Sequence, residues 1–482
     1  MNPFRTMFLS ICFSTLLIAA GCSVHRPQKV ELPVSYPDVY IEQTGPLTGA
    51  VRVGRWWEAF KDEKLNALMD ELFRQNLDLM QAYARLEQLN ALARSSKAAQ
   101  VPSVNIEAQA GRSMQPQAPS GDITGTNYNL SLAARYELDV WNKLSSRTEA
   151  ALFDMQASRE ELKALYISLS SQLADLYYLS VEQRSQLELT DRTIASFSDT
   201  LERVERRYRE GLIPALDVYQ ARQNLASAMA GRPVFEAALA RTEHAVAVLL
   251  GRYPDRETAG TIAVLPKTPD AFPAGLPSEL LSRRPDVQAG FLRVRAGDAR
   301  IAAAIADRFP SFNLLGSYGA SGIATGFGDA TGPFWSVLAN IALPVIDAGR
   351  RKAEVARAEA GFRETVAGYH KAVLTAFREV EDALVNNRTT EERIGRLEER
   401  VEAAGAALRL SMDRYLQGLS DYLPVLTAQT LHFEAQSQLL SARRQLISDR
   451  ISLARALGGN WMDEDIGKRL TRQVNNKDKE RS

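Results

Sequence analysis

The chain has 482 residues, in which 58 Lys and Arg residues balance 58 Asp and Glu residues, and 45% of all residues are hydrophobic. The zero net charge lacks the basic excess of a nucleic-acid-binding protein, and two cysteines are too few for a disulfide scaffold or a cysteine-rich metal site. After residue 21 no apolar run approaches the roughly 18–20 residues of a transmembrane helix, which excludes a multi-pass helical membrane protein.

The first 21 residues have the layout of a secretory signal. Arg5 precedes an apolar stretch over residues 7–20, and small residues lead up to Cys22. A charged start with a short apolar core and a small-residue end is typical of a cleaved signal. The run from Leu17 to Cys22 resembles a bacterial lipoprotein signal, in which Cys22 becomes the lipidated first residue and Ser23 implies sorting to the outer membrane. The alternative is an ordinary cleaved signal with an incidental cysteine.

Several segments predict helices far longer than those of globular domains. Residues Lys143–Glu210 contain neither Gly nor Pro over 68 positions, enough for about 100 Å of helix. Gly211 followed by Pro214 predicts a left-handed helix stop and a restart. We expect a further helix over Ala215–Leu250, kinked near Gly231 and Pro233.

Two more helical stretches lie in the second half, over Val345–Leu423 and Val425–Leu457. Such lengths fit either a coiled-coil rod or a helical tube. A rod needs one narrow apolar seam that repeats every 3.5 residues. Ala, Leu and Tyr are instead spread over broader helix faces here, which favours a tube.

The chain contains an internal duplication. The segment Tyr208–Val218 reappears as Tyr415–Val425 at an offset of 207, and Pro102–Asn105 reappears as Pro310–Asn313 at an offset of 208. Two landmarks at nearly one offset indicate a repeated unit of about 200 residues. The predicted organisation is therefore a lipoprotein signal (1–21), a lipidated N-terminal extension (22–55), a first repeat (56–250), a Pro-rich linker (251–279), a second repeat (280–460) and a charged C-terminal tail (461–482).

Each repeat contains two segments in which apolar and polar residues alternate. They cover about 102–112 and 127–140 in the first repeat, and about 310–320 and 333–345 in the second. Connections rich in Gly, Pro, Ser and Thr, at 112–126 and 321–332, predict two hairpins. These could be soluble hairpins with one face exposed to water, but their length in an exported chain better matches the strands of an outer-membrane barrel. Four strands cannot close a barrel, so at least two chains would have to share one.

A set of short motifs now resembles a known family. In this order and spacing they are similar to the outer-membrane efflux proteins of the TolC type, in the lipoprotein branch that includes OprM-like and NodT-like proteins. The motifs are Trp56–Asp62, Asn76–Leu79, Tyr136–Trp141, Leu280–Val287, Leu343–Arg351, Asp421–Leu423 and Ala456–Trp461.

The resemblance implies a mainly α fold with a transmembrane β-barrel. Two repeats, each with long helices and a two-stranded membrane hairpin, would form a homotrimer with a 12-stranded barrel on a periplasmic α-helical tube. The implied function is a passive duct for small toxic compounds in a tripartite efflux pump. The implied partners are a periplasmic adaptor (membrane fusion) protein, an inner-membrane RND-type transporter and outer-membrane lipid, with no cofactor other than the lipid on Cys22.

In this family the tube closes at its periplasmic end, where the duplicated motifs match the helix turns. Tyr415 occupies the position of a tyrosine in the closing network, and Asp217 that of its carboxylate partner. Ser420 stands where some members carry an arginine. Asp421 and Leu423 match the acid and the leucine at the tip, where they would form the constriction. The alternative is that Asp421 caps the helix that follows it.

No enzyme signature accompanies these features. The sequence lacks a phosphate loop ending in Gly-Lys-Ser/Thr, a zinc motif of the His-Glu-x-x-His type and a nucleophile elbow. The four histidines have no metal-ligand spacing, and we predict neither an enzyme nor a metal site. The rival function is a lipid-anchored helical stalk without a pore. Drugs, dyes, solvents and metal ions all remain open as transported substrates.

Overall fold

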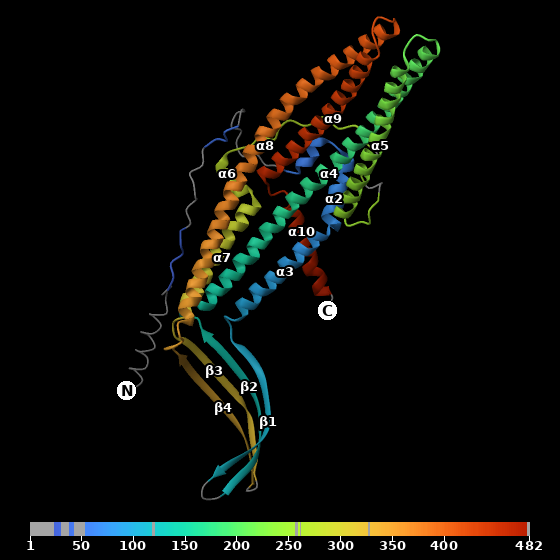
Figure 1. The fold of residues 1–482 in the computed structure, drawn as a ribbon. Coiled ribbons are helices and arrows are strands. Elements are labelled where there is room, and N and C mark those ends of the chain that lie inside the picture. The colour runs from blue at the N-terminus through green and yellow to red at the C-terminus, as the bar shows by residue number, and fades with distance from the viewer. Residues whose placement is uncertain are drawn as a thin grey trace. The chain divides into compact units, whose positions relative to one another are not determined.

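The computed structural model describes residues 24–29, 38–42, 54–117, 121–255, 259–260, 262–325 and 328–479 (Figure 1). The predicted signal and Cys22 lie outside the described residues. The described residues form two compact units: the first comprises those within 24–29, 84–159 and 289–371, and the second those within 38–83, 160–288 and 372–479. Each unit therefore combines segments of both sequence repeats.

The first unit contains one antiparallel sheet of four strands in the order β1-β2-β3-β4 (Figure 1). The strands are β1 Ser103–Gln117, β2 Gly121–Leu138, β3 Ser311–Thr325 and β4 Gly328–Ala342. The two hairpins, one from each repeat, meet where β2 pairs with β3. The sheet thus joins segments about 200 residues apart in the chain.

The strand register gives this sheet two different faces. Leu132 lies opposite Tyr318, and Tyr318 lies opposite Trp335, so the alternating apolar positions share one face. That face is solvent-accessible in the single chain, with Ile106, Trp335 and Val337 exposed by 74–75%. The other face carries mostly Asn, Gln, Ser and Gly. The alternation predicted from sequence is therefore confirmed.

The strands are longer at the hairpin ends than their sequence suggests. Composition predicts loops at 112–126 and 321–332, but β1 and β2 are paired as far as Gln117 and Gly121, and β3 and β4 as far as Thr325 and Gly328. Backbone pairing continues there because antiparallel ladders need no apolar side chains. At their other ends the expected strands are too long: β2 stops at Leu138 and β4 at Ala342.

Helices account for most of the remaining chain. The two longest, α4 and α8, have 67 residues each, and the helix predicted from Lys143 is confirmed. Among the described residues, no helix has both the length and the mean hydropathy needed to cross a membrane. The helices are η1 Trp56–Phe60, α2 Glu63–Gln75, α3 Leu77–Ala98, α4 Lys143–Arg209, α5 Ala215–Leu249, α6 Pro277–Arg283, α7 Pro285–Ala306, α8 Arg350–Leu416, α9 Leu423–Leu457 and α10 Asp463–Lys479.

Helix α5 is continuous through Pro233, near which the sequence predicts a kink. Two further segments differ in detail from expectation. Helix α8 covers less than the expected stretch Val345–Leu423, because it begins only after a turn at Ala348 and Gly349 and a turn at Gly418 ends it. The residues predicted as a charged tail contain the amphipathic helix α10.

Arginine side chains of two long helices bind the backbone of the linker between the repeats. Its described residues form neither helix nor strand until Pro277, where α6 begins. Two arginines donate to its carbonyl groups: Arg184 to Ile262 at 3.3 Å, and Arg450 to Pro269 at 3.0 Å. The irregular backbone is therefore fixed by side chains of the long helices α4 and α9.

An aromatic cluster in the second unit joins the first of the short motifs, Trp56–Asp62, to the last, Ala456–Trp461. The Trp461 ring lies edge-on to the Trp57 ring at 4.7 Å and also contacts Phe73 at 5.4 Å. Tyr166 of α4 packs on Phe73 at 5.1 Å, and its hydroxyl lies 3.0 Å from that of Tyr83. The first and last motifs are therefore two halves of one core.

The chain reaches this core through Gly458, which has a left-handed φ of 72°. A Cβ atom at this position would lie 2.8 Å from the carbonyl oxygen of Arg283. The same carbonyl accepts a hydrogen bond from the Gly459 amide at 3.3 Å. Both the backbone conformation and the close approach therefore require glycine at 458.

We predict that Gly458→Ala lowers the free energy of unfolding by about 2 kcal/mol or more, because it adds backbone strain to a clash with backbone. Gly467→Ala is the matched control, since Gly467 lies inside α10 and a Cβ atom added there would meet open space. The control should be neutral or stabilising by up to about 1 kcal/mol. Thermal unfolding followed by circular dichroism in detergent measures both, and equal effects would contradict this assignment.

Candidate functional site

The duplicated motifs fold into two equivalent turns, one between α4 and α5 and one between α8 and α9 (Figure 1). Gly211 and Gly418 have φ angles of 73° and 75°, which confirms the predicted helix stop. Their amides donate to the carbonyl oxygens of Tyr208 and Tyr415 at 2.9 and 3.0 Å. The two turns therefore share backbone geometry as well as sequence.

A small apolar core, here called the tip cluster, holds these two helical hairpins together. Because α4, α5, α8 and α9 all contribute to it, the hairpins cannot separate without exposing it. Its buried members are Val204, Val218, Ala221, Tyr415, Tyr422 and Val425, and Leu201, Ile213, Met412 and Leu426 pack at its edge.

Tyr415 lies inside the tip cluster. Its side chain is 2% exposed, and its ring packs against the Tyr422 ring at 5.5 Å. Its hydroxyl is buried and has no hydrogen-bond partner among the described residues. Burial raises the pKa of this phenol, and the negative charge of Asp217 adds to the effect. The expected pairing of Tyr415 with Asp217 is thus electrostatic proximity without a hydrogen bond, because the cluster encloses the hydroxyl.

Asp217 and Asp421 form an acidic pair at the tip. Asp217 lies in the first turn of α5 and is 9% exposed. Burial, and then the neighbouring Asp421 carboxylate, raise the pKa of Asp217. Asp421 and Leu423 are both exposed on the surface. The four residues predicted for the gate therefore gather at one site: Tyr415 and Asp217 are buried, and Asp421 and Leu423 lie on its surface.

Asp421 does not cap α9. The residue at the N-cap is Tyr422, without a capping hydrogen bond from its side chain, and the helix begins at Leu423. The alternative role for Asp421 as a helix cap is therefore wrong, because the turn ends one residue later than that role requires.

Arg207 is a residue of this site that the sequence analysis missed. Its guanidinium carbon lies 5.0 Å from the centre of the Tyr415 ring, a cation–π contact. Its Nη1 donates to the carbonyl oxygen of Leu416 at 2.8 Å, at the end of α8 where the helix dipole is negative. Arg207 thus joins the C-terminal turns of α4 and α8. The available signal was the repeated Arg-Tyr pair at 207–208 and 414–415.

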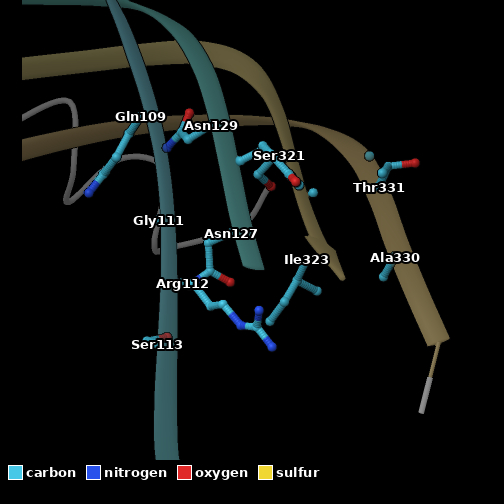
Figure 2. Close-up of a pocket in the computed structure, with 13 residues that line it drawn as sticks. Gln109, Gly111, Arg112, Ser113, Asn127, Asn129, Ser321, Ile323, Ala330 and Thr331 are labelled. Atoms are coloured by element: carbon cyan, nitrogen blue, oxygen red, sulfur yellow. The ribbon is translucent and has the colours of Figure 1, made fainter. Parts of the chain in front are cut away.

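A second candidate surface is the polar face of the sheet. Near the hairpin ends this face borders a cavity of about 730 Å³. Figure 2 shows that its lining residues come from all four strands, among them Gln109, Asn129, Ser321 and Ala330. Arg112 is the charged residue in this lining, and the other lining residues are uncharged.

Metal-ligating side chains do not gather elsewhere in the described part of the chain. No group of three or more His, Cys, Asp or Glu side chains there could hold a metal ion. The tip and the polar sheet face are therefore the two candidate sites.

We predict that Arg207→Ala lowers the free energy of local opening at the tip cluster by about 1–2 kcal/mol, because a cation–π contact and a charge-assisted hydrogen bond are lost together. Amide hydrogen exchange in residues 410–425 should accelerate by about 5- to 30-fold. Arg206→Ala is the matched control, because Arg206 is exposed and pairs with Glu202 on the surface of α4. Equal exchange in the two variants would remove Arg207 from the site.

Comparison with known proteins agrees with these features. A family model described as "Outer membrane efflux protein" matches residues 68–252 and 276–459. Among curated proteins, the solvent efflux pump outer membrane protein SrpC of Pseudomonas putida is 31% identical over 463 residues, covering 94% of this chain and 98% of SrpC. The outer membrane protein OprJ of Pseudomonas aeruginosa is 32% identical over 418 residues, covering 84% and 86%.

Solved structures show the same relationship. The outer-membrane channel OprN superposes with a TM-score of 0.84 at 28% identity, covering 91% of this chain and all of that one. The open state of the MtrE channel of Neisseria gonorrhoeae gives a TM-score of 0.77 at 26% identity, covering 90% and 98%. The names of these four proteins describe outer membrane proteins and outer-membrane channels, and that of SrpC an efflux pump. Matched over most of its length by sequence and by structure, the chain belongs to the outer membrane efflux protein family.

Proposed function

We propose that three copies of this chain form a passive duct that carries small toxic compounds across the outer membrane. The observation that carries this proposal is the sheet, which is apolar and exposed on one face and polar on the other. In a membrane-spanning barrel the apolar face would contact lipid and the polar face would line water.

The edges of the sheet support the number of copies. Within the described chain, β1 and β4 each pair with a strand on one side only. Lipid offers no hydrogen bonds to a free edge, so each edge needs a strand from another copy. Three copies supply twelve strands, as the family resemblance implies, and exceed the roughly eight strands of the smallest membrane barrels.

The helices support a duct that continues beyond the membrane. At 1.5 Å per residue, the 67 residues of α4 and of α8 each span about 100 Å. Together with α5 and α9 they would form the wall of a periplasmic tube. A lipid on Cys22 would anchor the N-terminal extension to the outer membrane.

The tip supports a gate at the periplasmic end. Three copies of Asp421 and Leu423 would place a ring of carboxylates and a ring of apolar side chains at the opening. Behind them, Tyr415, Asp217 and Arg207 lie where the hairpins of each copy meet. An adaptor that binds the open arrangement more tightly would shift the equilibrium towards it, and thereby connect the duct to an inner-membrane pump of the RND type.

The relatives suggest the kind of compound transported. The name of SrpC describes a solvent efflux pump. We therefore propose small hydrophobic or amphipathic toxic compounds as the substrates of the pump to which this duct belongs.

Single-channel recording of the purified protein in a planar bilayer tests the gate. The double variant Asp421→Ala with Leu423→Ala should raise conductance several-fold, because it removes both the charge ring and the apolar ring. The matched control is Asp413→Ala with Leu410→Ala, the same residue types on the exposed surface of α8 before the turn.

Two results would contradict the proposal at different points. Unchanged conductance in the Asp421 and Leu423 double variant would show that the gate lies elsewhere. Absence of any conductance in correctly folded oligomers, with export unchanged in a strain lacking the gene, would favour the rival function of a lipid-anchored stalk without a pore.

A further inference from the structure

The polar face of the sheet carries very little charge. The register places the odd-numbered residues of β1, β2 and β3 and the even-numbered residues of β4 on this face. By register, the ionisable residues of this face in the described part of the chain are Glu107, Arg135 and Glu137. All three lie towards the ends of β1 and β2 that connect to the helices. Arg112 has the register of the apolar face, but it lines the cavity near the hairpin ends.

Glu107 and Arg135 form a cross-strand ion pair. An Arg135 Nη2 atom lies 2.7 Å from Glu107 Oε1, with the two side chains exposed by 60% and 49%. They pair diagonally, since Arg135 lies opposite Ser103 and Glu107 opposite Ser131. An ion pair this exposed contributes little to stability. Its main physical effect is to cancel two charges on the surface that would face the passage.

The same compensation extends to the junction between the sheet and the helices. Glu137 pairs with Lys143, the first residue of α4. Lys143 and Arg147 lie 3.8 and 3.7 Å from Asp307. A further pair joins Arg351 and Asp347 at 3.2 Å. At the junction between the sheet and the helices, Lys143, Arg147 and Arg351 therefore pair with Glu137, Asp307 and Asp347.

We infer that Glu107 and Arg135 are specificity-determining residues that keep the part of the barrel passage next to the helices electrically neutral. This inference rests on the proposed function, because it requires the polar face to line the pore. A neutral wall in this part of the passage admits cationic, anionic and uncharged amphipathic compounds alike. Selection by charge is then left to the acidic tip, where Asp421 and Asp217 stand close together.

The physical basis is the screening length of the solution. Three copies of an unpaired Arg135 or an unpaired Glu107 would form one ring of like charge around the passage. At about 0.1 M salt, charges act over about 10 Å, which is comparable with the distance from a pore wall to a solute. Such a ring concentrates counter-ions in the passage and excludes ions of its own sign.

The test is the reversal potential of the full-length protein in a planar bilayer under a KCl gradient, with the Asp421→Ala and Leu423→Ala changes present to reduce the contribution of the tip. Glu107→Gln should shift the chloride-to-potassium permeability ratio towards chloride by about threefold or more, and Arg135→Gln should shift it towards potassium by a similar factor. The double variant Glu107→Gln with Arg135→Gln should return to the starting ratio, because the wall is neutral again.

Arg135→Lys separates charge from folding. It keeps the positive charge and should keep the starting permeability ratio, whereas a merely structural role of the guanidinium would not be rescued. Conducting channels whose ratio is the same in both single Gln variants would overturn the inference and leave the proposed duct intact. A folded protein that never conducts would overturn the proposed duct, and the inference with it.

Discussion

The proposed duct depends on one constraint: a backbone amide or carbonyl group in lipid must find its hydrogen-bond partner within protein. The four strands satisfy this constraint everywhere except along the outer edges of β1 and β4. Their apolar face exposes large hydrophobic side chains, which is unfavourable in water. The edge strands leave backbone groups without partners, which is unfavourable in lipid. A single chain therefore has unpaired sheet edges, and assembly with further copies would pair them.

The same logic explains how the duplicated sequence is used. Each repeat supplies one hairpin to the sheet and one pair of long helices with a glycine turn. The sheet joins the repeats through the pairing of β2 with β3, and the tip cluster joins them again through α4, α5, α8 and α9. A duplicated unit of this kind can form a wall that continues from one chain to the next, without large globular cores.

Sequence patterns predicted those elements whose signals are local. Gly211 marked the end of α4 because glycine adopts a left-handed φ without strain, and alternation along β2 identified the face it presents. The hairpin ends were missed because their Gly and Ser content is typical of loops, although the ladder continues through them. Arg207 was missed because its partners, Tyr415 and Leu416, lie more than 200 residues away.

The most direct test of the proposed duct is the number of chains in the purified complex, measured by native mass spectrometry in detergent. We expect three copies, whose twelve strands leave no free sheet edge. A stable, folded monomer would contradict the duct, because its four strands would keep two open edges. A dimer would also contradict it, since eight strands would close a different and narrower barrel.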